Sequence, residues 1–305
     1  MWLSVWNGRA WAMINAFTVD VEDYFQVAAL SETISPDDWE TWPCFVERNT
    51  GRILDLLAEK HIQGTFFILG WIAERYPALV RRIQREGHEI ASHGYSHQLI
   101  YTQSPDVFRD ETRRSKQLLE DITGEPVRGY RAASYSITRQ SLWALDILAE
   151  LGFEWDSSVF PVVHDRYGIP GTPRFPYRIR TQYGELTEFP ISTCRIGRYQ
   201  LPIAGGGYFR IFPYWLTRWG LGRVNREGQP FVFYLHPWEV DPDQPRVKVS
   251  ARSRFRHYTN LSKTHHRLDR LLSQFRFAPV GTVLGHEAGS QETEVVELET
   301  LRKAA

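Results

Sequence analysis

The sequence predicts an α/β fold in which a parallel sheet or barrel is surrounded by helices. Two observations support this prediction. Short β-rich runs alternate with amphipathic stretches through most of the 305 residues, an order typical of parallel sheets. In addition, the polar residues best suited to chemistry follow directly after the predicted strands. Catalytic groups of a barrel lie just after the carboxyl ends of its strands, so the second observation favours a barrel.

The predicted elements run through most of the chain. The predicted strands are Asn15–Asp20, Gly64–Gly70 and Glu89–His93, followed by the runs VRGYR, FEWDSSV, LTEFP and FVFYLH. The predicted helices cover residues 46–61, about 73–86 and about 105–122, the run SLWALDILAEL, and residues 261–275. Prolines and glycines interrupt this pattern between residues 160 and 226, where we expect an elaborated loop or an insertion. We expect an N-terminal extension over residues 1–14. The acidic residues 285–305 are predicted to form a loosely held tail or a peripheral helix.

The composition limits the possible functions. With 42% hydrophobic and 24% charged residues, the chain resembles an ordinary folded protein. Lysine plus arginine equals aspartate plus glutamate at 36 each, which argues against a nucleic-acid-binding protein. Cys44 and Cys194 are far apart and indicate two reduced thiols. No apolar run reaches the roughly 18 residues of a membrane helix, and the N-terminus lacks signal-peptide features. We therefore expect a cytoplasmic protein that starts at Met1 or Met13.

An acidic cluster, Asp20-Val21-Glu22-Asp23, follows the first predicted strand. Three carboxylates in four residues repel one another unless a cation or an arginine neutralises them. The cluster is therefore either part of a charged site or an exposed acidic turn that caps a helix.

Two histidines, His93 and His97, follow the predicted strand EIAS. Histidines four residues apart can bind one metal ion, and with one carboxylate they form a three-ligand site with open positions. Such a spacing arises easily by chance. Its position after a strand, like that of the acidic cluster, makes the metal hypothesis stronger.

Three further polar residues occupy strand ends: Arg131, Asp156 and His236. Arg131 is either a surface charge or the partner of a nearby carboxylate. Asp156 could pair with Arg131 or hold a histidine in one tautomer. His236 is either a core residue or an imidazole at the mouth of the site.

The stretch from Gly64 to His97, GTFFILGWIAERYPALVRRIQREGHEIASHGYSH, resembles the polysaccharide deacetylases of carbohydrate esterase family four. The resemblance covers roughly residues 15–238. The runs TVDVEDYF, GYRAASYSI, DSSVFP, EFP, GGGYFR and FYLHPWE are similar to those of deacetylases associated with bacterial exopolysaccharide and exosortase loci. The resemblance implies a distorted (β/α) barrel of about seven parallel strands with an elaborated C-terminal part. The catalytic domain would span residues 15–284, with residues 155–284 including the family-specific part.

The resemblance also implies roles for the strand-end residues. Asp20 would be the general base, His236 the general acid, Arg131 the residue that orients Asp20, and Asp156 a support for the histidine side. His93 and His97 would bind a divalent metal ion, for which we expect zinc. Backbone N–H groups near Ser134 and Tyr135 would help to hold the oxyanion, and Tyr135, Tyr208 and Trp238 either stack on sugar rings or pack in the core.

The chain departs from the family pattern at two places. The usual motif has two adjacent aspartates, whereas Val21 here separates Asp20 from the next acid. The metal carboxylate is therefore either Glu22 or Asp23. Ala132 and Ala133 replace the common prolines of the arginine motif, which leaves the oxyanion donor open.

These features predict a hydrolase that removes N-acetyl groups from hexosamine residues of an exopolysaccharide or its precursor. One alternative is an amide hydrolase for a small molecule or a lipid-linked sugar, whose mouth residues 160–226 would close. A non-catalytic sugar-binding module is disfavoured because every group that the reaction needs is present. Residues 246–270 contain eight lysines or arginines and one acid, Asp269. They form either a solvated face or a dock for an anionic sugar, a lipid-linked diphosphate or a membrane surface.

Overall fold

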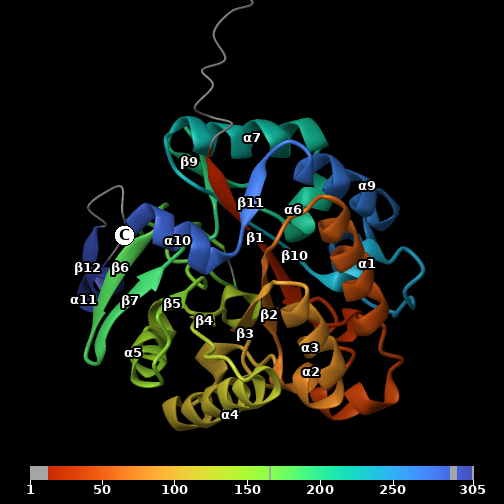
Figure 1. Cartoon of the computed structure of the whole chain (residues 1–305), viewed down its shortest axis with the longest axis horizontal. Coiled ribbons are helices and arrows are strands. Elements are labelled where there is room, and N and C mark those ends of the chain that lie inside the picture. Colours follow the sequence, from red (N-terminus) through yellow and green to blue (C-terminus); the bar gives the residue numbers. More distant parts are fainter. Residues whose placement is uncertain (1–12, 165, 289–293, 304–305) are drawn as a thin grey trace, which may run out of the picture.

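Seven parallel strands follow one another in the order β10-β1-β2-β3-β4-β5-β7 in the computed structural model of the chain (Figure 1). The structure describes residues 13–164, 166–288 and 294–303, so most of the expected extension over residues 1–14 lies outside the described residues. Helices α1 to α4 lie along the outside of the strands. The prediction of an α/β fold with about seven parallel strands is confirmed.

The strands are β1 Ile14–Val21, β2 Thr65–Ile68, β3 Glu89–Ser92, β4 Gly129–Tyr130, β5 Trp155–Asp156, β6 Tyr177–Thr181, β7 Gly184–Glu188, β8 Thr193–Ile196, β9 Tyr199–Pro202, β10 Val232–Leu235, β11 Arg276–Ala278 and β12 Val295–Glu297. The helices are α1 Val46–Glu59, α2 Gly70–Arg75, α3 Pro77–Arg85, α4 Pro105–Thr123, α5 Trp143–Glu150, α6 Gly206–Ile211, α7 Tyr214–Arg226, α8 Ala251–Tyr258, α9 Leu261–Leu272, α10 Val280–Ala288 and α11 Leu298–Lys303.

The central strands are buried on both faces, as parallel strands covered by helices usually are. All four residues of β2 (TFFI) and of β10 (VFYL) are buried. Among them, Phe66, Phe67 and Phe233 have no exposed surface. This continuous apolar character explains why the sequence shows these strands as unbroken hydrophobic runs rather than as alternating patterns.

The barrel is distorted where β7 should meet β10. Within the described parts of the chain, no strand pairing joins these two strands. Instead, the Val232 N–H donates to the Ser192 hydroxyl at 2.9 Å, and the Tyr234 N–H donates to the Ala204 carbonyl at 2.9 Å. Gly205 forms an isolated parallel bridge with Tyr234. Loop segments therefore satisfy the free edge of β10 in place of a strand.

Residues 160–226 contain more regular structure than the predicted loop. They form the antiparallel pairs β6–β7 and β8–β9, and the helices α6 and α7. The prolines and glycines of this segment led to the prediction of a loop, and of its four short strands only β7 was predicted in part. Within the predicted acidic tail, β12 pairs with β6 and α11 follows it.

The helix predicted around residues 73–86 is two helices, α2 and α3. The break is at Tyr76, which has φ −125° and ψ 53° and lies directly before Pro77. A proline disfavours the helical conformation in the preceding residue and cannot donate a backbone hydrogen bond. Apolar periodicity alone could not show this break.

No helix in the described part of the chain combines the length and the apolar character that crossing a membrane requires.

We expect Gly205→Ala to destabilise the fold by roughly 2–4 kcal/mol. Gly205 has φ +136°, and a Cβ atom there would lie 1.8 Å from the Tyr234 carbonyl oxygen. The matched control is Gly207→Ala in α6, where the nearest atom to a new Cβ is 3.9 Å away. It should be neutral or stabilising by up to about 1 kcal/mol. Urea denaturation of both variants measures the difference, and equal stabilities would contradict this account of how the edge of β10 is covered.

Candidate active site

The polar residues predicted from strand ends lie together at the carboxyl end of the sheet. Ser92, the last residue of β3, lies opposite Ile68 of β2 and Tyr130 of β4, so the residues that follow these strands reach the same edge. A cavity of about 160 Å³ opens there. Its lining includes Asp20, Glu22, His93, His97, His236 and Trp238.

Glu22, His93 and His97 can hold a metal ion. Each offers one ligand atom, and the three atoms lie within 4.8 Å of one another. Glu22 and His93 are buried. Two imidazoles and one carboxylate leave positions open on the ion, which is the arrangement of catalytic rather than structural sites.

The hydrogen bonds around this cluster fit a bound cation. The Oε2 atom of Glu22 is buried and has no hydrogen-bond partner among the described residues, although it lies 2.8 Å from Nε2 of His97. An unsatisfied buried oxygen is costly, and a cation would satisfy it. His93 bonds through Nδ1 to the Arg131 carbonyl at 2.8 Å, which leaves Nε2 free as a ligand. Burial lowers the pKa of His93 to about 4, which favours the neutral imidazole that metals bind.

Asp23 points away from this cluster. Its Oδ1 atom accepts a hydrogen bond from the Tyr24 N–H at 2.7 Å, and its Oδ2 atom accepts one from the Phe45 N–H. The first of these bonds caps the short 3₁₀ helix Tyr24–Gln26, and the second ties Asp23 to the start of α1. Of the two carboxylates that the sequence left open, the structure therefore brings Glu22 to the histidines. The capping interpretation of the acidic cluster applies to Asp23.

Asp20 forms a buried ion pair with Arg131. Asp20 Oδ1 lies 2.7 Å from a terminal nitrogen of Arg131, and Arg131 has no exposed surface. The guanidinium also donates to the Thr18 hydroxyl at 2.8 Å and to the carbonyl and hydroxyl of Ser157 at 3.1 and 3.0 Å. It lies 3.9 Å from the centre of the Phe67 ring. Arg131 is thus fixed on all sides and orients the Asp20 carboxylate.

His236 faces both carboxylates of the cavity. Its Nε2 atom lies 3.5 Å from Oε1 of Glu22 and 3.8 Å from Oδ2 of Asp20. On the other side of the ring, Nδ1 lies 2.7 Å from Oε1 of Glu239. Burial alone would lower the pKa of His236, but Glu22, Glu239 and Asp20 raise it to about 9. These neighbouring carboxylates favour the protonated imidazole, the form that can donate a proton.

The aromatic and backbone groups expected at the site are partly engaged elsewhere. Ser134 and Tyr135 line the cavity with φ values of +51° and +54°. The Tyr135 N–H donates to the Ala132 carbonyl at 3.0 Å, so it is not free for an oxyanion. Trp238 is 5% exposed and donates to Oε1 of Glu22 at 3.3 Å. Its position supports Glu22 rather than a stacked sugar.

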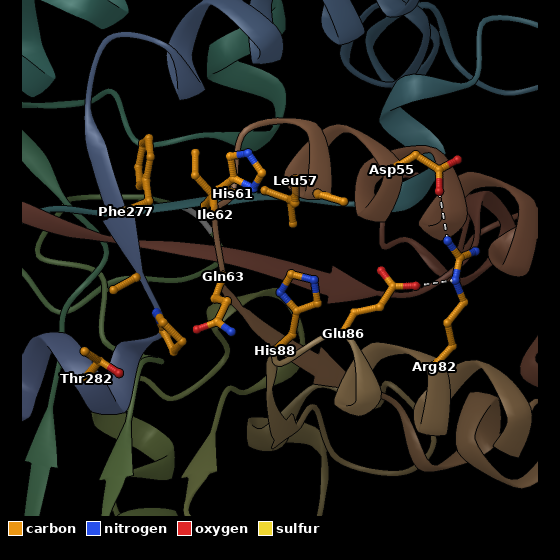
Figure 2. Close-up of a pocket in the computed structure, with 13 residues that line it drawn as sticks. Asp55, Leu57, His61, Ile62, Gln63, Arg82, Glu86, His88, Phe277 and Thr282 are labelled. Atoms are coloured by element: carbon orange, nitrogen blue, oxygen red, sulfur yellow. Dashed lines mark hydrogen bonds and ion pairs between the residues drawn. The ribbon is translucent and has the colours of Figure 1, made fainter.

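A larger cavity, of about 630 Å³, lies at the opposite, amino end of β2 and β3 (Figure 2). Both of its carboxylates are paired with one arginine, since Arg82 bonds to Asp55 at 2.8 Å and to Glu86 at 2.7 Å. His88 accepts a hydrogen bond from the Gly64 N–H at 3.2 Å, and burial lowers the pKa of His88 to about 4. No convergent set of acid, base and ligands is present among the described residues that line it, so the smaller cavity is the candidate active site.

Comparison with known families agrees with this geometry. Residues 36–155 match the polysaccharide deacetylase family. The chain contains a polysaccharide deacetylase domain. Residues 157–285 match a second family, described as a domain of unknown function, DUF3473. The segment that matches the deacetylase family begins after Glu22 and ends before His236. The candidate site therefore includes residues on both sides of the matched segment.

Two curated relatives and one solved structure illustrate the similarity. A peptidoglycan-N-acetylglucosamine deacetylase of Bacillus cereus is 34% identical over 98 residues, 32% of this chain and 36% of the relative. A chitooligosaccharide deacetylase of Rhizobium leguminosarum bv. trifolii is 32% identical over 100 residues, 33% of this chain and 44% of the relative. Each match thus spans less than half of the relative. The crystal structure of a Mycobacterium smegmatis protein classed as a polysaccharide deacetylase has a TM-score of 0.64 at 22% identity, with 96% of both chains covered. It shows the shared fold.

Asp156 does not lie beside a site histidine of the deacetylase domain. Its Oδ1 atom accepts from the Ser158 hydroxyl at 2.6 Å, and it pairs with the buried carboxyl of Glu188. Burial and the neighbouring acid raise the pKa of Glu188 well above its usual value, and burial raises the pKa of Asp156 to about 6. A hydrogen bond between two carboxyl groups requires one proton, so the direction of both pKa shifts indicates a proton held between these side chains. The position expected to support a histidine holds a structural acid pair instead.

Sequence reasoning missed Glu239 and Arg210, which complete the surroundings of His236. Glu239 bonds to His236 and is itself bonded by Arg210. The run FYLHPWE carried a signal, because an acid three residues after a strand-end residue has the spacing of a capping box. Arg210 gave no signal, since its contact with Glu239 joins segments 29 residues apart.

In the deacetylase domain we expect Glu22→Gln to weaken zinc binding by more than about 100-fold, because the amide oxygen carries no charge. Asp23→Asn should cost stability through its lost capping charge and leave the zinc affinity within about threefold of the wild type. Isothermal titration calorimetry with zinc measures both variants. If Asp23→Asn lost the metal and Glu22→Gln retained it, the assignment of the carboxylate would be reversed.

The buried acid pair predicts a pH dependence of stability. The pKa values of Asp156 and Glu188 are higher in the folded chain than the ordinary values of 3.8 and 4.5. Their contribution to stability is therefore present below about pH 4 and is lost as the pH rises through the folded values. Glu188→Gln should raise stability at pH 7 by on the order of 2–3 kcal/mol and flatten the pH profile. Exposed Glu185→Gln on the same strand is the control, with an expected change below about 0.5 kcal/mol. Urea denaturation from pH 5 to 8.5 measures both, and parallel profiles would refute the shared proton.

Proposed function

We propose that this chain is a metal-dependent deacetylase that hydrolyses N-acetyl groups on hexosamine units of a bacterial exopolysaccharide or its precursor. One observation carries the proposal. Asp20, whose carboxylate is oriented by the buried Arg131, lines the same cavity as the cluster of Glu22, His93 and His97. His236, a proton-donating imidazole, lines it as well. A base, an acid and a metal site around one cavity are what hydrolysis of an unactivated amide requires.

Zinc is the ion that we propose for the cluster, because two imidazoles and one carboxylate are typical of catalytic zinc sites. The ion supplies Lewis acidity toward the amide carbonyl. The three ligands come from the ends of β1 and β3 and the turn that follows β3. They are therefore held by the sheet and need no large movement to bind the ion.

The protein side chains handle the protons. Asp20 takes a proton from the attacking water, and Arg131 holds the carboxylate in position for this step. His236 gives a proton to the leaving nitrogen through Nε2, the atom that faces the cavity. An amine leaves poorly from the tetrahedral intermediate without that proton.

The proposed substrate follows from the relatives and the cavity. The two curated relatives are named for deacetylation of N-acetylated glycans. The cavity of about 160 Å³ is smaller than the roughly 300–1,000 Å³ of pockets that enclose a whole ligand. It accommodates an acetamido group while the rest of a sugar chain lies outside. The resemblance of the motifs to those of exopolysaccharide loci suggests the polymer.

The same small cavity favours a second candidate, the hydrolysis of a small amide that enters it completely. Tyr167 from the segment 160–226 contributes to the lining, as expected if that segment restricts the mouth. A small-molecule enzyme would prefer a monomeric amide, whereas a polymer deacetylase would act faster on longer oligomers.

Acetate release from N-acetylglucosamine monomer and oligomers by zinc-loaded protein tests the proposal. We expect activity that increases with chain length, that falls at least about 100-fold in Asp20→Asn and His97→Ala, and that is lost on chelation and restored by zinc. Exposed Asp37→Asn and His265→Ala are matched controls and should retain wild-type activity.

Two outcomes would contradict the proposal. Release from the monomer alone would favour the small-amide hydrolase. A zinc-loaded protein that bound the oligomers and released no acetate from any of them would favour a sugar-binding module.

A further inference from the structure

A buried carboxylate lies on the side of His236 that faces away from the cavity. Oε1 of Glu239 is 2.7 Å from Nδ1 of His236 and accepts the His236 backbone N–H at 3.1 Å. Glu239 is 1% exposed. This contact is local, because the 3₁₀ helix Pro237–Val240 begins directly after His236 and turns Glu239 back onto it. A carboxylate only accepts hydrogen bonds, so the contact places a hydrogen on Nδ1. The ring is thereby oriented with Nε2 toward the cavity.

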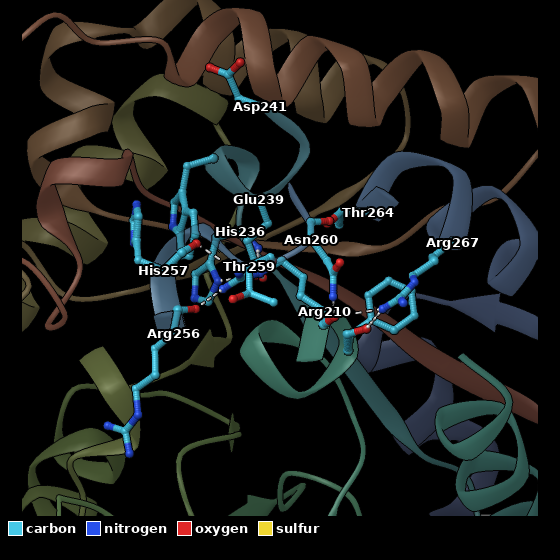
Figure 3. Close-up of polar contacts among 12 residues, drawn as sticks. Arg210, His236, Glu239, Asp241, Arg256, His257, Thr259, Asn260, Thr264 and Arg267 are labelled. Atoms are coloured by element: carbon cyan, nitrogen blue, oxygen red, sulfur yellow. Dashed lines mark hydrogen bonds and ion pairs between the residues drawn. The ribbon is translucent and has the colours of Figure 1, made fainter. Parts of the chain in front are cut away.

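Arg210 holds Glu239 from the other side (Figure 3). The Nε atom of Arg210 donates to Oε2 of Glu239 at 2.5 Å. Its terminal nitrogens donate to the backbone carbonyls of Arg256 and His257 in the last turn of α8 and of Thr259 directly after that helix. These distances are 2.8–2.9 Å. Arg210 is 2% exposed. Burial alone would raise the pKa of Glu239, but Arg210 and His236 lower it to about 2.

The ring of Trp238 restricts the remaining movement of His236. It stacks on His236 with ring centres 5.4 Å apart and an interplanar angle of 19°. Trp238 also stacks on His257, with ring centres 4.3 Å apart, and its ring centre lies 5.1 Å from the guanidinium carbon of Arg210. The imidazole is thus clamped by a hydrogen bond at Nδ1 and by an aromatic face.

These contacts give Glu239 the role that the sequence pattern suggested for Asp156. Asp156 is bonded to Ser158 and shares a proton with Glu188, so it is not available to His236. Both Glu239 and Arg210 belong to residues 157–285, the segment that matches the domain of unknown function.

We propose that Glu239, held by Arg210, is the positioning residue for the general acid His236, and that this is one task of the C-terminal family segment. The inference rests on the proposed deacetylase function. In the step concerned, the C–N bond of the tetrahedral intermediate breaks and its electron pair goes to nitrogen. The nitrogen takes the proton from Nε2, and the proton that Asp20 removed from water returns to Nε2 of His236, 3.8 Å from Oδ2 of Asp20. The products are the free amine and acetic acid, which loses its proton to the solvent. Glu239 keeps Nε2 aimed at that nitrogen and stabilises the protonated ring.

The dependence on the leaving group tests this role. An amide of N-acetylglucosamine oligomers needs a proton to expel its amine, whereas 4-nitrophenyl acetate expels a phenolate that leaves without one. We expect Glu239→Ala to lower kcat on the oligomer about 100-fold, with KM and the kcat on the ester within about threefold of the wild type. Glu239→Gln retains an oxygen that can accept from Nδ1 and should show an intermediate loss on the oligomer alone. Exposed Asp243→Asn, four residues further along, is the matched control and should leave both reactions unchanged.

The outcomes separate this inference from the function on which it rests. A wild type inactive on both substrates would overturn the proposed function and this inference with it. An active wild type whose Glu239 variants lose both reactions equally, or neither, would overturn only the positioning role. If Glu239→Ala fails to fold because Arg210 loses its partner, the nearly isosteric Glu239→Gln decides by the same ratio of the two reactions.

Discussion

The buried ion pair between Arg131 and Asp20 determines how the rest of the site is arranged. Arg131 extends from the end of β4 and reaches Thr18 and Asp20 of β1 and Ser157 after β5. A buried charge without partners costs several kcal/mol, so these segments stay in the register that satisfies it. Its backbone carbonyl also bonds to His93. Arg131 thereby links Asp20 to the cluster of Glu22, His93 and His97.

The buried carboxylates near the cavity are stabilised in different ways, and the differences assign their roles. Asp20 has an arginine, and Glu239 has both an arginine and an imidazole. Among the described residues, the side-chain partners of Glu22 are histidines and a tryptophan, and one of its oxygens has no hydrogen bond there. Asp156 and Glu188 pair with each other, and the nearby charge of Arg131 lowers the pKa of each carboxyl less than burial raises it. In the mechanism proposed above, these carboxyl groups take the different roles of base, positioning group, ligand and structural pair because their neighbours differ.

Much of this arrangement could be predicted from the sequence, because strand ends of a parallel sheet converge wherever the strands are recognised. Asp20, His93, His97, Arg131 and His236 were found in this way, and all line or contact the cavity. The direction of a side chain is harder to predict. The choice between Glu22 and Asp23 depends on a backbone N–H of Phe45, 22 residues away. The surroundings of Asp156 and Arg210 are set by contacts with segments that are distant in the sequence, and no local sequence pattern predicts such contacts.

The two family matches meet at residue 156, in the last position of β5 and inside the sheet. Three contacts cross that boundary: Arg131 bonds to Ser157, β5 pairs with β7, and β1 pairs with β10. The first segment contains His93 and His97, the proposed metal ligands, whereas the second contains His236 and Glu239, the proposed acid and its positioning residue. The two matched segments are consequently not independent structural modules in this chain, because they share one sheet and line one cavity.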